Sequence, residues 1–171
     1  MDAAPPIIVR AARGEDRAVI RDLTLAAYGQ YATVMEPSAW SGLRQAIEAA
    51  LAVDHGAQQL VAERSGEIVG SVLLFPPSAD AYGDLGPRVR WPEIRALAVA
   101  PSARGLGVAR LLVNECIRRA REAGADAIGL HTSPSMRDAI RLYEKFGFAR
   151  DPALDIDVEG SEPIQAYRRA L

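Results

Sequence analysis

A glycine-bearing turn between an apolar segment and a helical pattern is the part of this sequence best suited to chemistry with a ligand. The apolar segment covers residues 93–99 and stops before Pro101, and the helical pattern continues to about Ala123. Gly105 and Gly107 lie between them. The first N–H groups of a helix have no partner inside it, and glycine lets a ligand approach the backbone closely. We therefore expect a phosphate-bearing ligand at this turn.

Two common phosphate-binding loops are excluded by the residues around the turn. The dinucleotide-binding fingerprint needs a third glycine, but Gly105 and Gly107 are followed by Arg110. The nucleoside-triphosphate loop ends in Gly-Lys-Ser or Gly-Lys-Thr, and this sequence has neither ending. An ordinary turn between a strand and a helix is the remaining alternative.

The turn and a second segment together resemble one known family. Residues 104–109 read R-x-x-G-x-A, and residues 140–148 read I-R-L-Y-E-K-F-G-F. Both segments resemble motifs of the GCN5-related N-acetyltransferase (GNAT) family, in which the first motif binds the pyrophosphate of coenzyme A. The resemblance implies one α+β domain over residues 1–171. Its central sheet is mixed and mostly antiparallel, with a splayed pair of parallel strands and helices on both faces.

The resemblance also implies an activity and a co-substrate. We expect transfer of an acetyl group from acetyl-CoA to the primary amine of a small molecule, by direct attack in a ternary complex. The backbone of the central strand would bind the pantetheine and the acetyl carbonyl, and the turn would bind the pyrophosphate. For Arg104, a purely structural role is the alternative. The predicted cofactor-binding residues are Leu97, Ala98, Val99, Arg104, Gly105, Leu106, Gly107, Val108, Ala109 and Arg110.

Acetyl transfer to an amine needs a base, an oxyanion donor and an acid, because an ammonium has no lone pair and the departing thiolate needs a proton. By resemblance, Glu93 is the candidate base, and an exposed carboxylate at a strand end is the alternative. Tyr143 is the candidate acid, although it also lies on the apolar stripe of its helix. His131 is an alternative base, or a structural histidine. An N–H near Leu97 would donate to the oxyanion.

One position departs from the family pattern, and the acceptor site has no specific motif. Met136 stands where the family often has an asparagine that contacts the cofactor, and Ser133 or Ser135 could replace that contact. Aromatic residues outside the two motifs are the candidates for the wall of an acceptor pocket, with core packing as the alternative for each. They are Tyr28, Tyr31, Trp40, Tyr82 and Trp91.

Composition narrows the class of protein. The chain has 171 residues, of which 49% are apolar and 25% charged, and its formal net charge is −2. These values indicate a globular protein and give no reason to expect nucleic-acid binding by a basic face. The single cysteine, Cys116, excludes an internal disulfide, and the two histidines show no metal-ligand spacing with it. A serine-hydrolase elbow is also missing.

No apolar stretch has transmembrane length, and the first residues do not resemble a signal peptide, so we expect a cytoplasmic protein. Two other functions stay open: acetylation of a protein or peptide amine, and a coenzyme-A-binding sensor without catalysis. Dimers are common in the family, but nothing in the sequence specifies a homodimer.

The elements that must position these residues follow from hydrophobic periodicity and turn residues. Pro37 is expected to break any helix, and Ser38 to cap the next one. We expect four helices. The first begins at Glu15 and has Val19 on its apolar stripe, and the second begins after Ser38. The third follows the glycine turn and ends near Ala123, and the fourth covers Met136 to Lys145. We expect strands over Ile7 to Ala11, on both sides of Ser65-Gly66, over 93–99, over Ile128 to His131, and near Leu154 to Val158 and Ile164 to Tyr167.

Overall fold

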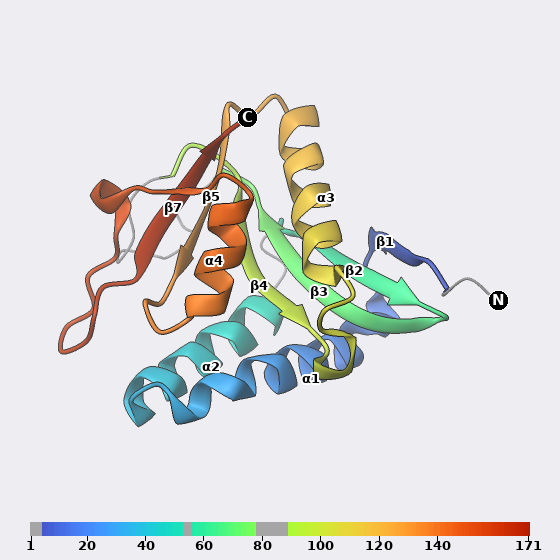
Figure 1. Ribbon diagram of the computed structural model, residues 1–171, viewed down its shortest axis with the longest axis horizontal. Coiled ribbons are helices and arrows are strands. Elements are labelled where there is room, and N and C mark those ends of the chain that lie inside the picture. Colours follow the sequence, from blue (N-terminus) through green and yellow to red (C-terminus); the bar gives the residue numbers. More distant parts are fainter. Residues whose placement is uncertain (1–4, 53–55, 78–88) are drawn as a thin grey trace. The chain divides into compact units, whose positions relative to one another are not determined.

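The computed structural model describes residues 5–52, 56–77 and 89–171. In the chain, one strand, two helices and three strands are followed by a helix, a strand, a helix and two last strands (Figure 1). The elements are β1 (Ile7–Ala11), α1 (Arg17–Tyr28), α2 (Pro37–Ala52), β2 (Gln58–Arg64), β3 (Glu67–Phe75), β4 (Glu93–Val99), α3 (Val108–Glu122), β5 (Ala127–Thr132), α4 (Arg137–Lys145), β6 (Ala149–Arg150) and β7 (Gln165–Ala170).

The strands form one mixed sheet in the order β1-β2-β3-β4-β5-β7-β6. β4 and β5 pair in parallel, whereas β1–β2, β2–β3, β5–β7 and β6–β7 pair antiparallel. A parallel pair needs a crossover connection, and α3 supplies it between β4 and β5. The predicted α+β class with a parallel strand pair is confirmed.

Two compact units make up the chain. One contains Met1–Leu74 and Ala96–Cys116, and the other contains Phe75–Arg95 and Ile117–Leu171. β4 and α3 each continue from one unit into the other, and the single domain over residues 1–171 stays a prediction.

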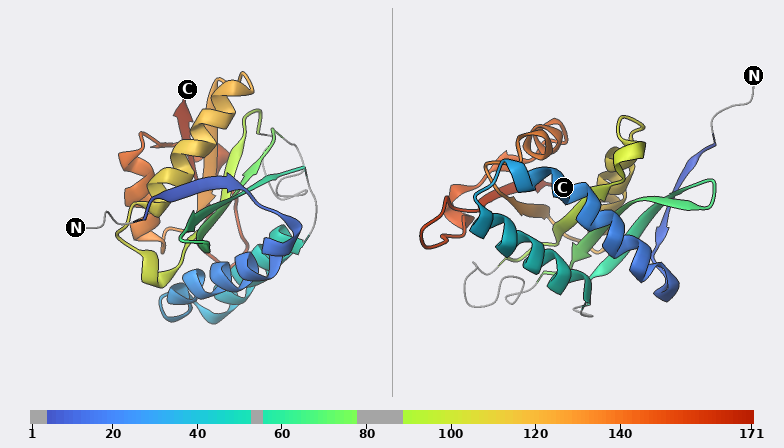
Figure 2. Two further views of the ribbon diagram at one scale, coloured as in Figure 1. Left: turned by 90° about the vertical axis from the view of Figure 1, so that its right-hand side faces the viewer. Right: turned by 90° about the horizontal axis from the view of Figure 1, so that it is seen from below.

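The first unit packs helices on both faces of its strands. β2 and β3 form the expected hairpin, in which Ser65 and Gly66 have positive φ values of 54° and 82°. The register of the hairpin skips Val69, so Ile68 and Gly70 face opposite sides of the sheet. Ile68 packs on the α1 side, and Gly70 lies against α3. Figure 2 shows α1 and α2 side by side.

Three predictions about these helices are wrong. Pro37 does not break the second helix: it is the first residue of α2, where a proline's missing N–H costs nothing. Ser38 therefore lies inside the helix and not at its cap. On α1, Val19 is 49% exposed, and the buried face is formed by Ile20, Leu23, Thr24 and Ala27.

The second unit contains the first residues of β4 together with β5, α4, β6 and β7. Antiparallel pairing of β5 and β7 runs from Ala127–Ala170 to Thr132–Gln165. The strand expected near Leu154 to Val158 is not formed: Pro152–Leu154 is a 3-10 turn (η5), and only Ile156 bridges to Ile164. The sixth strand is instead the short β6, at Ala149–Arg150.

Candidate active site

β4 leaves its regular course in the middle of the strand. Its parallel pairing with β5 comprises Glu93–Gly129 and Ile94–Leu130. Two residues further on, Ala96 has a φ of +50°. This left-handed conformation costs an alanine about 1–2 kcal/mol, and such strain is typically retained where the backbone has to serve a site. Sequence reasoning missed Ala96, because nothing in its residue type distinguishes it from Ala98.

The turn after β4 presents free main-chain donors. A 3-10 turn (η4, Pro101–Ala103) leads into Gly105 and Gly107, whose φ values are +79° and +81°, and α3 then begins at Val108. The N–H of Leu106 is used internally, by the carbonyl of Ala103 at 3.4 Å. Among the described residues, no backbone acceptor is found for the N–H groups of Gly105, Gly107, Val108, Ala109 and Arg110. These donors stand at the positive end of the α3 dipole and are suited to an anion.

Arg104 lies in the turn and ties it to α1. One of its guanidinium nitrogens, Nη2, donates to the carbonyl of Ala27 at 3.3 Å, near the C-terminal end of α1. Ala27 in turn packs with Leu23 and with Ala98 of β4. This contact agrees with the structural alternative for the Arg104 side chain, and its role in binding phosphate stays a prediction.

Glu93 and His131, the two candidate bases, lie against each other. Oε1 of Glu93, at the start of β4, is 3.1 Å from Nδ1 of His131, near the end of β5. The two side chains are 3% and 2% exposed, so Glu93 is not the exposed strand-end carboxylate that was its alternative. The second carboxylate oxygen, Oε2, is buried and has no hydrogen-bond partner among the described residues.

The contacts of His131 define where its protons are. Nε2 lies 2.8 Å from the carbonyl oxygen of Leu154. A carbonyl can only accept, so Nε2 must carry a hydrogen. Nδ1 is therefore the nitrogen that faces Glu93. A buried carboxylate with one oxygen close to an imidazole nitrogen and the other unpaired is suited to receive a proton from a bound ligand or from a water molecule.

Tyr143 is buried, with 7% of its surface exposed, and its ring meets that of Phe148 edge-on at 5.8 Å. Its catalytic role stays a prediction. Met136 is also buried and accepts a hydrogen bond from Thr132 Oγ1 at 3.4 Å, so it is a packing residue in this unit. Ser133 Oγ accepts from the N–H of Ser135 at 3.3 Å.

The aromatic candidates for the acceptor wall belong to different parts of the fold. Tyr28 and Tyr31 meet edge-on at 5.8 Å at the end of α1. Burial, and then the neighbouring Tyr31, raises the pKa of Tyr28 well above its ordinary value, so its hydroxyl stays protonated. Trp40 is half-buried on α2, and Tyr82 lies outside the described residues. Trp91 belongs to the second unit, and the substrate-binding role of all five residues stays a prediction.

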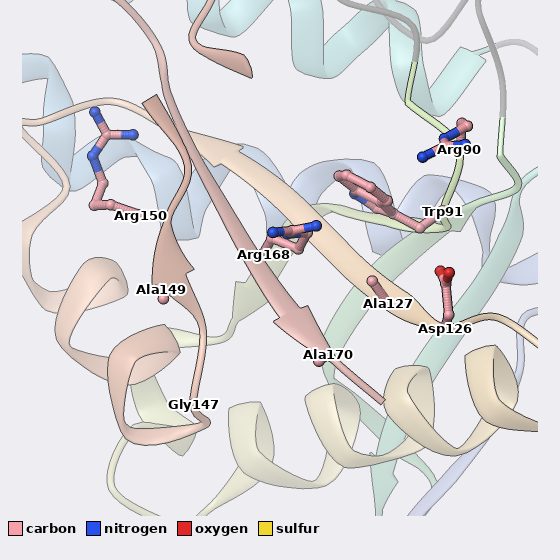
Figure 3. A pocket seen from close by; sticks show the side chains of 9 residues that line it. All are labelled: Arg90, Trp91, Asp126, Ala127, Gly147, Ala149, Arg150, Arg168 and Ala170. Carbon is pink, nitrogen blue, oxygen red and sulfur yellow. The ribbon is translucent and has the colours of Figure 1, made fainter. Parts of the chain in front are cut away.

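Trp91 lines a cavity of about 510 Å³ in the second unit (Figure 3). The guanidinium of Arg168 lies over its ring, 5.1 Å from the centroid, and Arg168 also pairs with Asp151 at 3.3 Å. The lining residues are Arg90, Trp91, Asp126, Ala127, Gly147, Ala149, Arg150, Arg168 and Ala170. Neither Glu93 nor Tyr143 is among them, so we do not assign this cavity to the predicted chemistry.

The described residues contain no group of three or more His, Cys, Asp or Glu side chains that could hold a metal ion. Their helices also include none with the length and apolar character needed to cross a bilayer. The cytoplasmic location and the homodimer stay predictions.

Comparison with known proteins decides the family. A family model described as the acetyltransferase (GNAT) family matches residues 20–148, which include β4, the glycine turn and α4. The chain belongs to the GNAT family. This confirms the resemblance seen in the two sequence motifs.

Some GNAT relatives are similar to part of the chain in sequence, and solved GNAT structures are similar to its fold over most of its length. A mycothiol acetyltransferase from Sanguibacter keddieii is 40% identical over 107 residues, which are 63% of this chain and 32% of that protein. The chain covers about a third of the length of three such mycothiol acetyltransferases. The structure of a histone acetyltransferase HPA2 and related acetyltransferase from Corynebacterium glutamicum has a TM-score of 0.69, 25% identity, and coverage of 97% of this chain and 96% of that one.

A second solved structure was determined with a ligand. The GNAT family acetyltransferase from Brucella melitensis in complex with acetyl-CoA has a TM-score of 0.58 and 26% identity, and the match covers 84% of this chain and 83% of that chain.

Proposed function

We propose that this chain is an acetyl-CoA-dependent N-acetyltransferase that acts on the primary amine of a small molecule. The observation that carries the proposal is the set of main-chain donors at Gly105, Gly107, Val108, Ala109 and Arg110. They gather at the N-terminus of a 15-residue helix, directly after the strand in which Ala96 is strained. A diphosphate has the charge and the acceptor oxygens that such a turn can bind.

The residues of β4 and the turn fit the co-substrate in two ways. The free N–H groups of the turn would hold the pyrophosphate of acetyl-CoA, and the backbone from Leu97 to Val99 would pair with the pantetheine as an added strand. The acetyl-CoA complex of the Brucella melitensis relative supports this choice of co-substrate. A main-chain N–H near Leu97 would donate to the thioester oxygen as negative charge develops on it.

The proton chemistry is assigned to Glu93 and Tyr143. Acetyl-CoA supplies the activated acetyl thioester. Glu93 takes a proton from the ammonium at Oε2, directly or through a water molecule, so that the amine can attack the acetyl carbon. As the C–N bond forms and the C–S bond breaks, Tyr143 gives its proton to the departing sulfur and regains one from the new amide nitrogen. In the net reaction one proton ends on Glu93 and returns to solvent.

A small-molecule acceptor is the version that the relatives favour. Relatives at 40% and 36% identity are named mycothiol acetyltransferase and IAA acetyltransferase, after small molecules. Tyr28 packs against the cluster that contains Ala98 of β4, and Tyr31 meets Tyr28 edge-on. They would supply an apolar wall for such an acceptor.

Release of coenzyme A, followed with acetyl-CoA and a panel of small amines and peptides, tests the proposal. We expect turnover with a small amine, and a fall in kcat of about 10²–10⁴-fold for Glu93→Gln. Glu67→Gln is the matched control, because Glu67 also begins a strand but is exposed. Tyr143→Phe should lower kcat, whereas Tyr167→Phe, which changes another buried tyrosine, should not.

Three outcomes of this assay would change the assignment. Binding of coenzyme A without turnover of any amine would indicate a sensor. Turnover restricted to peptides would move the acceptor to a protein amine. Full activity in both Glu93→Gln and Tyr143→Phe would refute the roles given to these residues.

A further inference from the structure

The buried contact between Glu93 and His131 connects three segments of the second unit. Glu93 begins β4, His131 lies near the end of β5, and Leu154 ends η5. The Oε1–Nδ1 distance is 3.1 Å, and the distance from Nε2 to the Leu154 carbonyl is 2.8 Å. The imidazole thus lies between an acceptor that fixes one of its nitrogens and a carboxylate that faces the other.

The chemistry of these atoms restricts what the imidazole can do. Nε2 must donate to the Leu154 carbonyl, which leaves Nδ1 to face Oε1. A 3.1 Å approach between nitrogen and oxygen is attractive when a proton lies on one of the two atoms, and repulsive when two lone pairs meet. Asp155 is near enough to His131 to interact with it electrostatically, and Arg150 holds both of its carboxylate oxygens with bonds of 2.7 and 2.8 Å.

We propose that His131 is a positioning residue for Glu93. Its Nδ1–H donates to Oε1 and so leaves Oε2 as the oxygen that receives the amine proton. Two observations support this: Oε2 is buried without a partner among the described residues, and the Leu154 carbonyl fixes the imidazole nitrogen that faces the carboxylate. The inference rests on the proposed function for the identity of the proton donor. The contact itself can be tested without any activity.

Two amide substitutions separate this role from simple anchoring of η5. In an asparagine at position 131, the amide nitrogen is the same number of bonds from Cβ as the histidine Nδ1, so it can still donate to Glu93. In a glutamine, the amide nitrogen is the same number of bonds from Cβ as the histidine Nε2, so it can reach only the Leu154 carbonyl. We expect His131→Asn to keep kcat within about threefold of the original and His131→Gln to lower it about 10- to 100-fold, because a misplaced catalytic group loses that much. The KM for acetyl-CoA should stay unchanged in both.

The reverse order, with the glutamine variant active and the asparagine variant impaired, would show that His131 serves Leu154 and overturn the proposal. Equal effects of the two substitutions would overturn it as well. Circular dichroism and coenzyme A binding on each variant show whether it is folded. If either variant fails to fold, the NMR measurement on the unchanged histidine decides.

That measurement uses the ¹⁵N shifts of the imidazole, assigned by their loss in a His131 variant. We expect a hydrogen on both Nε2 and Nδ1, and in Glu93→Gln a shifted Nδ1 resonance with Nε2 unchanged. An unprotonated Nε2, or an Nδ1 resonance indifferent to Glu93→Gln, would overturn the proposal. If the NMR result holds but no amine is acetylated, the proposed function fails and the contact stands.

Discussion

Gly70 of β3 is the position at which one methyl group should disturb the glycine turn from a distance. A Cβ added there would lie 2.5 Å from Cγ1 of Val108 and 3.1 Å from both the carbonyl oxygen of Ala98 and Cδ1 of Leu112. Val108 begins α3 and is 1% exposed, so its short branched side chain has little room to move. The backbone oxygen of Ala98 cannot rotate away. Gly70→Ala must therefore push α3 and β4 away from β3.

Overpacking of this kind costs about 1–3 kcal/mol. For a chain of this size, 1 kcal/mol lowers Tm by about 2–4 °C, so Gly70→Ala should melt roughly 2–12 °C below the original. The KM for acetyl-CoA should rise as well, because Val108 carries one of the turn's free N–H groups. Differential scanning calorimetry and urea denaturation measure the first effect, and initial-rate kinetics the second.

Gly42→Ala on α2 is the control for that substitution. A Cβ at Gly42 meets no atom within 4 Å, and alanine favours a helix, so this variant should be more stable by about 0.5–1 kcal/mol. If Gly70→Ala unfolds at the same denaturant concentration as the original chain, the packing of β3 against α3 is looser than the distances indicate and the reasoning is refuted.

Two more predictions concern the turn and the half-buried ion pair of Arg150 and Asp155. Gly107→Ala places a Cβ on a residue with a φ of +81°, so it should lower the stability by about 1–2 kcal/mol, which thermal melting measures. It should also raise the KM for acetyl-CoA, which initial-rate kinetics measure. An unchanged KM would contradict the role of the turn. The pKa of Asp155 is lowered below its ordinary value of 3.8, first by its hydrogen bond with Arg150, so its contribution to stability is present above about pH 4 and is lost as the pH falls through the lower, folded-state pKa. Asp155→Asn should therefore be less stable than the original chain at neutral pH and approach its stability in acid. Urea denaturation across a range of pH measures the difference in unfolding free energy between the two chains, and a difference that does not change with pH would contradict the prediction.

Much of the region around the glycine turn could be predicted from the sequence. The strand 93–99, the turn and the helix after it each carry a local signal: apolar residues, then proline and glycines, then a repeat of 3.6 residues. The structure has β4 at Glu93–Val99 and α3 from Val108 to Glu122. The buried residues of α3 include the expected Leu112, Val113 and Cys116.

The errors arose where neighbouring strands or helix starts decide the structure. Ile156 and Ile164 read as parts of two strands, yet they form a single bridge, because Pro152 begins a 3-10 turn. Pro37 predicts a helix break but begins α2, because proline can mark either the end of a helix or its first position, and the sequence alone does not separate the two.

The candidate site shows the same limit. The sequence offers Glu93 and His131 as two separate candidate bases, although they lie on paired strands with their side chains 3.1 Å apart. Periodicity describes one strand at a time and does not give the register between two. The available signal is that His131 is a polar residue near the end of an otherwise apolar segment. That signal marks His131 but does not indicate that Glu93 lies against it.

The chain's only sulfhydryl group makes the proposed assay simpler. Cys116 is on the buried face of α3 and has no exposed surface. A colorimetric thiol reagent added during turnover should therefore report released coenzyme A with almost no background from the native protein. The same shielding makes the labelling rate of Cys116 a measure of how often α3 opens, which would give the Gly70 variant an independent kinetic readout.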